Sequence, residues 1–304
     1  MKKCTSCGIT VDDHFHSCPA CNGELEQIGS TGKKRFISII KAWLYTEAFV
    51  AVSYVTAIIA GIVLSVIYYD PSDKDYITKV LTVDVENVIT LSSYVLFGVL
   101  LTVFFCLRKK NVLREVGITK CPPSALAVSA LFGISANYLY SFVVGIIPWP
   151  DGILEAHNDA YALLEDGGNI VLTVVTVALL TGVFEEVVYR GLVMTRLRRS
   201  LHPAIACIIS ALLFSLAHPS VISAVYTAVF GLCLALIFEK YASVVPCIVS
   251  HVCFNLMACI GYPEGDAVTL IILAASAVLH TVSIFALVML PSAKDASVNG
   301  AEQI

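Results

Sequence analysis

Residues 169–199 read NIVLTVVTVALLTGVFEEVVYRGLVMTRLRR, and this stretch decides the class of protein. Its apolar run is long enough for a transmembrane helix, which needs about 20 residues to cross about 30 Å of hydrocarbon. Glu185, Glu186 and Arg190 interrupt the run. A charge at bilayer depth costs at least about 2.5–3.5 kcal/mol on insertion scales, so several are retained only where they satisfy one another or serve a function.

The composition extends this conclusion to the whole chain. Of its 304 residues, 58% are hydrophobic and 14% are charged, against roughly 25% charged in a soluble domain. The sequence therefore predicts an all-α, polytopic membrane protein, which excludes an ordinary soluble enzyme. The net charge of −4 is small. The expected surroundings are the lipid bilayer, and no nucleic acid is expected as a partner.

Eight apolar runs are candidates for membrane-spanning helices, with the fifth short and the fourth long. They cover residues 42–69, 87–107, 122–149, 169–195, 203–218, 220–240, 244–262 and 267–290. We therefore expect a bundle of about eight transmembrane helices.

The loops between these runs alternate in charge. Basic residues gather before the first run and after the second, fourth, sixth and eighth, and the intervening loops are mostly acidic. Because cytoplasmic loops carry the excess of Lys and Arg, both termini are expected in the cytoplasm. The first apolar run is expected to act as an uncleaved signal anchor of an integral protein, in a bacterial plasma membrane. The basic residues are Lys33, Lys34, Arg35, Lys41, Arg108, Lys109, Lys110, Arg114, Lys120, Arg196, Arg198, Arg199, Lys240 and Lys294.

A separate polar module precedes the first run. Cys4, Cys7, Cys18 and Cys21 form the pattern C-x2-C-x10-C-x2-C, which is the spacing of a tetrahedral Cys4 zinc site. About 28 residues cannot build a hydrophobic core, so bound Zn²⁺ would supply the folding free energy. A Cys4 site has no open coordination position, so this zinc ribbon is expected to be structural, or to dock a cytoplasmic partner, and not to be catalytic.

These features divide the chain into four parts. They are a zinc ribbon at 1–28, a basic linker at 29–41, a transmembrane domain at 42–292 and a disordered tail at 293–304.

The charges of the fourth run have a helical spacing that favours pairing. Glu186 and Arg190 are four residues apart and can form an ion pair on one helix face. Glu185 is rotated by about 100° from Glu186 and lacks that partner. An unpaired buried carboxylate suits a general base. The alternative for Glu186 and Arg190 is an ion pair that only fixes helix packing.

Two further motifs lie on later helices. Phe214 and His218 are spaced i, i+4 in FSLAH on the fifth run. His251 and Asn255 have the same spacing in HVCFN on the seventh run, although such an Asn can also be an ordinary interhelical hydrogen bond. Each motif is weak alone, but three in order on separate helices indicate one buried site.

Together these motifs resemble the CAAX-protease and bacteriocin-processing family, also called CPBP or Abi. That family shows E-E-x-x-x-R, then F-x-x-x-H, then H-x-x-x-N, and this chain matches all three. The resemblance covers about residues 120–262. It implies an intramembrane endopeptidase acting on a membrane-associated protein or peptide, either CAAX-like or bacteriocin-like.

The resemblance also implies roles for the six polar residues. Glu185 would activate water with help from His218, and His251 with Asn255 would stabilise the oxyanion. Glu186 and Arg190 would orient the helix. A rival assignment within the family is a catalytic Zn²⁺ held by the Glu and His side chains.

Two other functions compete with the protease hypothesis. One is a catalytically silent membrane scaffold or bacteriocin self-immunity protein that uses the ribbon to dock a partner. The other is a small transporter with the buried charges as a proton relay. A transporter often shows repeated halves, and this sequence shows none.

Overall fold

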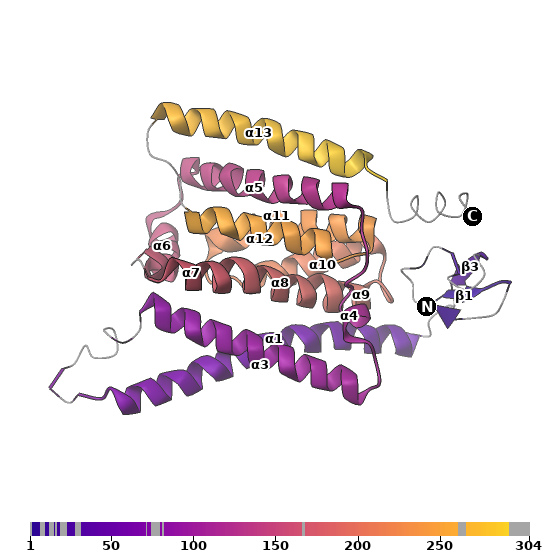
Figure 1. The fold of residues 1–304 in the computed structure, drawn as a ribbon, viewed down its shortest axis with the longest axis horizontal. Coiled ribbons are helices and arrows are strands. Elements are labelled where there is room, and N and C mark those ends of the chain that lie inside the picture. Colours follow the sequence, from indigo (N-terminus) through magenta and orange to yellow (C-terminus); the bar gives the residue numbers. More distant parts are fainter. Residues whose placement is uncertain are drawn as a thin grey trace.

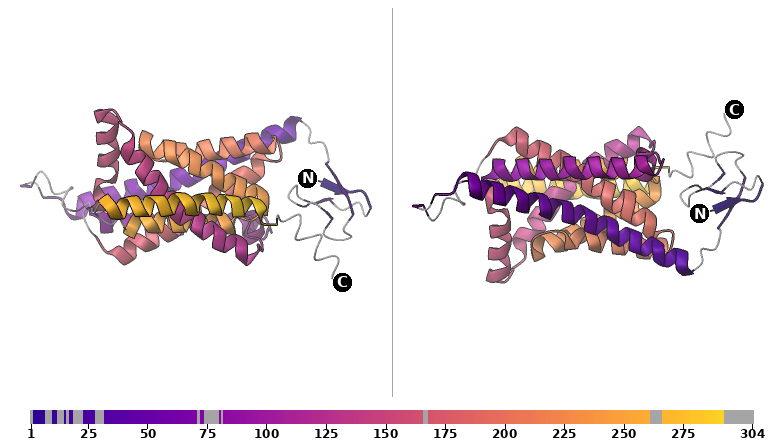
Figure 2. Two further views of the ribbon diagram at one scale, coloured as in Figure 1. Left: turned by 90° about the horizontal axis from the view of Figure 1, so that it is seen from above. Right: turned by 90° about the horizontal axis from the view of Figure 1, so that it is seen from below.

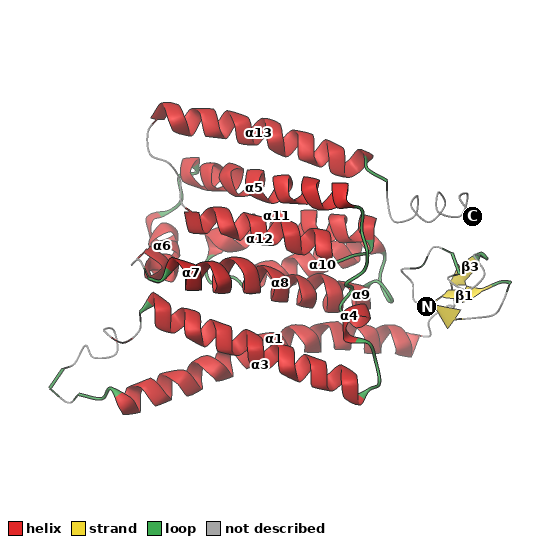
Figure 3. Cartoon of the chain, viewed as in Figure 1, coloured by secondary structure: helices red, strands yellow, loops and turns green. Residues whose placement is uncertain are grey.

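The computed structural model describes residues 2–6, 10–11, 15, 17–18, 23–27, 32–70, 72–73, 80, 82–165, 168–260 and 266–291. Its N-terminal part is a small antiparallel sheet with strand order β2-β1-β3. Strand β1 (Lys2–Cys4) pairs with β2 (Thr10–Val11) and with β3 (Leu25–Gln27). The rest of the described chain is helical (Figure 3).

A helix is present at each of the eight predicted apolar runs (Figure 1). Seven of them are α1 (Gly32–Ile67), α3 (Val83–Leu107), α5 (Pro123–Ile146), α10 (Pro203–Leu216), α11 (Val221–Tyr241), α12 (Val245–Ile260) and α13 (Asp266–Met289).

The eighth lies fourth in the chain and is divided into segments of different winding. These are α7 (Ile170–Thr173), η1 (Val174–Leu180), α8 (Thr181–Glu186), η2 (Val187–Met194) and α9 (Thr195–Leu197), with η1 and η2 in the π conformation.

Two of the eight expected spans are too short to cross a bilayer. In the described part of the chain, six helices are long and apolar enough to do so. Helices α10 and α12 have 14 and 16 residues. A rise of 1.5 Å per residue makes them about 21 and 24 Å long, against about 30 Å of hydrocarbon. The chain is an integral membrane protein, and these two apolar helices are shorter than its hydrocarbon layer.

The helices lie roughly parallel or antiparallel in a layered bundle (Figures 1 and 2). Helix α13 packs on α5, α5 on α12, and α12 on the segmented helix, whose other side meets the α1–α3 pair. One buried cluster lies where α1 and α3 meet η2, and a second lies among α5, α11 and α12. The start of α1, the segment α9 and the end of α13 lie at the same end of the bundle (Figure 1).

One helix was not expected. Residues 150–168 have only a loop assignment in the sequence analysis, but Asp151–Glu165 forms α6, which crosses the ends of other helices (Figure 2). This helix is amphipathic, but its acidic residues obscure that pattern in the sequence. It is too short to span a membrane. His157 Nδ1 lies 2.8 Å from Ser220 Oγ, the N-cap of α11. Burial lowers the pKa of His157 below its ordinary value of 6.5.

The predicted linker at 29–41 is also largely helical. Helix α1 begins at Gly32, ten residues before the predicted span at Ala42. The sequence KKRFISIIK has no helix breaker after Gly32, and long basic side chains can extend from a helix towards the membrane surface. The basic segment is therefore the first part of α1, and not a flexible connection.

A four-residue helix, α4 (Val112–Glu115), follows α3 in the chain, and its Glu115 contacts Arg196 of the segmented helix. The Glu115 carboxylate accepts hydrogen bonds from Arg196 Nη2 and Lys110 Nζ, both at 2.7 Å. Burial alone would raise the pKa of Glu115, but the hydrogen bond from Lys110 and the charge of Arg196 outweigh it. The pKa is left below its ordinary value of 4.5.

Candidate active site

The two glutamates lie on a short α-helical segment between two π-helical ones. In a π-helix each N–H bonds to the carbonyl five residues back, and such segments are frequent at functional sites. Thr181 Oγ1 and Thr195 Oγ1 also reach five residues back, donating to the carbonyls of Thr176 and Arg190 at 2.9 and 3.3 Å. The glutamates therefore lie in a six-residue α-helical segment with a wider π-helical segment on each side.

Glu186 is the centre of a buried charged cluster. Its Oε1 accepts hydrogen bonds from Arg190 Nη1 at 2.6 Å and from His251 Nδ1 at 2.9 Å. Arg190 Nη2 also donates to the Gly231 carbonyl at 2.9 Å. The side chains of Glu186 and Arg190 are fully buried. The predicted i, i+4 ion pair is present, and it extends to a histidine 65 positions away.

Glu185 faces the other nitrogen of the same imidazole. Its Oε2 lies 3.8 Å from His251 Nε2. Within the described residues this oxygen is buried and has no hydrogen-bond partner. A carboxylate only accepts hydrogen bonds, so His251 donates Nδ1–H to Glu186. In the neutral ring, Nε2 then presents a lone pair to the space beside Glu185.

The ring of Phe214 links the remaining members of the site. The Arg190 guanidinium lies 4.7 Å from its centroid. The rings of His218 and His251 meet it edge to face at 4.9 and 5.6 Å. Phe214 and His218, spaced i, i+4 in the sequence, therefore pack against each other. His218 lies just beyond the end of α10, where its Nδ1 lies 3.0 Å from the Phe214 carbonyl.

Asn255 lies on α12, one turn after His251, and contacts the widened helix. Its Nδ2 donates to the Val177 carbonyl, in η1, at 3.0 Å. Asn255 is expected at the oxyanion, but one of its two amide hydrogens is used in the bond that joins α12 to η1. The ordinary interhelical hydrogen bond considered as its alternative is thus observed.

Close helix packing brings these groups together. A Cβ placed on Gly182 would lie 2.8 Å from Cγ2 of Val252 and 3.0 Å from its backbone nitrogen. Because Gly182 lacks a Cβ, the backbone of α8 can approach α12. This contact lies three residues before Glu185 and next to His251, so it sets their separation.

Two backbone carbonyls and one aromatic ring that contact the site were not identified from the sequence motifs. The Gly231 carbonyl holds Arg190, the Val177 carbonyl holds Asn255, and the Phe230 ring lies 5.7 Å from His251. A backbone carbonyl has no side-chain signature, and an aromatic residue in an apolar helix resembles ordinary core. No sequence signal could have identified them.

The donor set at the glutamates does not fit a catalytic zinc ion well. Such sites use three protein ligands. Glu186 Oε1 is already shared by Arg190 and His251, whereas Glu186 Oε2 and Glu185 Oε2 have no hydrogen-bond partner in the part of the chain that the structure describes. Glu185 Oε2 and His251 Nε2, 3.8 Å apart, converge as one pair. Among the described residues, no group of three or more His, Cys, Asp or Glu is arranged to hold a metal.

The predicted ribbon zinc site is only partly within the described residues. Cys4 and Cys18 are buried, and the backbone nitrogen of Ser6 donates to Cys4 Sγ at 3.4 Å. N–H groups turned towards sulfur are common around metal-binding thiolates. Cys7 and Cys21 lie outside the described residues, so a structural zinc ion remains a prediction.

Residues 167–257 match a family model described as type II CAAX prenyl endopeptidase Rce1-like. The matched segment contains all six candidate catalytic residues. No curated protein and no solved structure matches the chain significantly.

Proposed function

Because residues 167–257 form an Rce1-like domain of the CAAX-protease family, we propose that Glu185 and His251 activate the water that cleaves a membrane-associated substrate. Family membership supports a membrane protease of the CAAX type. The single observation that carries the finer proposal is the 3.8 Å approach of Glu185 Oε2 to His251 Nε2. Two acceptors this close can both receive hydrogen bonds from one water molecule placed beside them.

In the proposed reaction Glu185 removes a proton from this water as the oxygen attacks the scissile carbonyl. The same proton is then given to the departing amine, so Glu185 ends the cycle as a carboxylate. Glu186 holds His251 with Nε2 directed at the reacting oxygen, which fixes the ring as a buried carboxylate does in catalytic triads.

The second N–H of Asn255 is the proposed donor to the oxyanion. An amide nitrogen carries two hydrogens, and the bond to the Val177 carbonyl uses one and fixes the direction of the other. His218 would supply an acceptor and not a donor. The Phe214 carbonyl can only accept and therefore receives Nδ1–H, which leaves a lone pair on Nε2 of the neutral ring for the attacking water.

The experiment compares wild type with Glu185→Gln on a quenched peptide ending in a prenylated CAAX-type sequence, in detergent or nanodiscs. Loss of a general base should lower kcat by about 10²–10⁴-fold. Glu86→Gln, on a carboxylate in the first turn of α3, is the matched control and should cleave normally. Equal cleavage by wild type and Glu185→Gln would remove Glu185 from the mechanism. An unprenylated peptide tests whether the lipid is required.

We further propose that catalysis needs no metal, and that any zinc is held by the ribbon cysteines. The zinc content of full-length wild type is compared with that of His251→Ala and Cys4→Ser. Cys4→Ser should lose the ion, and His251→Ala should retain it. A stoichiometric loss of zinc in His251→Ala would instead support the metalloprotease assignment.

A further inference from the structure

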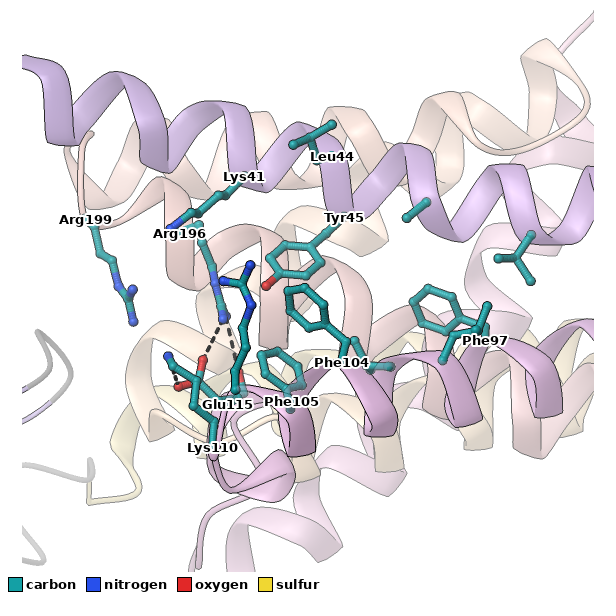
Figure 4. Close-up of a pocket in the computed structure, with 15 residues that line it drawn as sticks. Lys41, Leu44, Tyr45, Phe97, Phe104, Phe105, Lys110, Glu115, Arg196 and Arg199 are labelled. Carbon is teal, nitrogen blue, oxygen red and sulfur yellow. Dashed lines mark hydrogen bonds and ion pairs between the residues drawn. The ribbon is translucent and has the colours of Figure 1, made fainter.

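A cavity whose lining includes neither Glu185 nor Glu186 lies between α1 and α3 (Figure 4). Its volume is about 450 Å³, and α4 and α9 border one end. The described lining contains none of the six candidate catalytic residues. The proposed peptidase reaction therefore gives this cavity no role.

One end of the cavity is strongly basic. It has five cationic side chains and one carboxylate, namely Lys41, Arg108, Lys110, Arg196, Arg199 and Glu115. The carboxylate is already neutralised by Lys110 and Arg196 at 2.7 Å each. The basic end thus carries an excess of positive charge within a membrane protein, which calls for an anion.

The arginines at this end are backed by aromatic rings. The Arg108 guanidinium lies 4.5 Å from the Phe104 centroid, and the Arg196 guanidinium lies 5.1 Å from the Tyr45 centroid. The N–H edge of Arg196 already donates to Glu115 and to the Gly191 carbonyl. Stacking occupies the face of the Arg108 guanidinium and leaves its N–H edge for hydrogen bonds. That edge matches the geometry of phosphate oxygens.

The other end of the cavity is apolar. Lys41 and Val52 line it from α1, and Arg108 and Phe97 line it from α3; each pair is 11 residues apart. Figure 4 shows Lys41, Lys110, Arg196 and Arg199 towards one end of the cavity and Phe97 towards the other. At 1.5 Å per residue the slot is about 16 Å long. This is about half of a 30 Å hydrocarbon layer, which is the depth of one leaflet.

We propose that this cavity binds one anionic phospholipid, with its phosphate at the basic end and one acyl chain between α1 and α3. A free phosphate ion would leave the apolar slot unused, and a neutral lipid would not balance the positive charges of Lys41 and Arg108. Leu44 and Leu100 line the slot and are about half exposed, so an acyl chain can enter from the bilayer. The basic end lies on the face predicted to be cytoplasmic, where anionic lipids are found.

The bound lipid would join three separate parts of the fold. Its headgroup would contact α1, α3 and Arg199, which follows α9 at the end of the helix that carries Glu185. The α1–α3 pair would then be fixed against the catalytic helix by a ligand, in addition to its direct packing.

The test measures lipid retention by native mass spectrometry of full-length protein released from nanodiscs. The nanodiscs contain equal amounts of phosphatidylglycerol and phosphatidylcholine. Wild type should retain one phosphatidylglycerol. Lys41→Gln/Arg108→Gln should bind it about thirty-fold more weakly, at about 1 kcal/mol for each removed charge. Lys109→Gln/Lys120→Gln removes two exposed charges outside the cavity's lining and should bind like wild type.

A second variant tests the apolar slot with the cations intact. Ala48 lines the cavity and is exposed, so Ala48→Phe should block the acyl chain without harming the core. Ala51→Phe, at an exposed position of the same helix outside the lining, should retain the lipid. Equal retention of both lipids by wild type, or unchanged retention in Lys41→Gln/Arg108→Gln or Ala48→Phe, would overturn the proposal. So would displacement of the lipid by millimolar inorganic phosphate, which would indicate a simple anion site.

Discussion

Replacing Arg190 by Met should reveal how strongly the buried charges depend on one another. Arg190→Met leaves Glu186 fully buried with only His251 as a partner. Removing one member of a buried ion pair costs about 3–5 kcal/mol, because the other charge stays desolvated. Glu186→Gln should cost a similar amount for the same reason, since it leaves the Arg190 guanidinium with the Gly231 carbonyl.

The double variant Glu186→Gln/Arg190→Met removes both charges and should recover much of the lost stability. Groups in one ion-pair network usually show coupling energies of about 0.5–3 kcal/mol, and we expect the upper end. The measurement is reversible unfolding in mixed micelles, with the free energy of unfolding compared across the four proteins. The partly exposed pair of Arg198 and Glu239, 2.9 Å apart, is the control, and Arg198→Met should cost no more than about 1 kcal/mol.

Activity separates a packing role from a positioning role. If Glu186 orients His251, the double variant should regain stability but still cleave about 10²-fold more slowly. The reason is that no carboxylate would then hold Nε2 of the imidazole towards the reacting oxygen. Single variants that each cost less than 1 kcal/mol, or costs that simply add, would refute the coupled network. A double variant with full activity would leave the pair a purely structural role.

Three further outcomes are expected. Gly182→Ala should push α8 from α12 at Val252 and destabilise the protein by about 1–3 kcal/mol, measured by thermal unfolding. The stabilising bonds of Glu115 should be present above its ordinary pKa of 4.5 and be lost as pH falls through the lower folded-state pKa, seen as faster hydrogen exchange in α4. The docking of α6 should be strongest above pH 6.5 and weaken as pH falls towards the lowered pKa of His157. Faster hydrogen exchange of the α6 amides would report this weakening.

Each has its own control. A Cβ on Gly61 would meet nothing within 4 Å, so Gly61→Ala should leave thermal stability unchanged or slightly higher. Glu115→Gln should remove the acid-dependent exchange of α4. Likewise, His157→Phe should abolish the increase in hydrogen exchange of α6 as the pH falls below 6.5. Persistence of either pH effect in its variant would assign it to another group.

Sequence by itself determined the class of fold and most of the candidate site. Apolar runs fixed where the eight helices lie, because burial in lipid requires a continuous apolar surface. The four-residue spacing of Glu186 and Arg190 predicted their ion pair, because that separation is a property of one helix. The fifth run is already short in the sequence, but the early end of α12, the extended start of α1 and helix α6 could not be predicted, because end positions depend on what each terminus packs against.

Only the tertiary structure decided how these side chains are shared. Glu186 meets His251, and Asn255 meets the Val177 carbonyl, across separations of 65 and 78 residues. No local periodicity encodes such contacts, since they depend on helix packing at Gly182 and on the widened turns around α8. The basic cavity also depends on tertiary structure. In the sequence its Lys and Arg residues indicate only the topology, and the antiparallel packing of α1 and α3 places them beside one apolar slot.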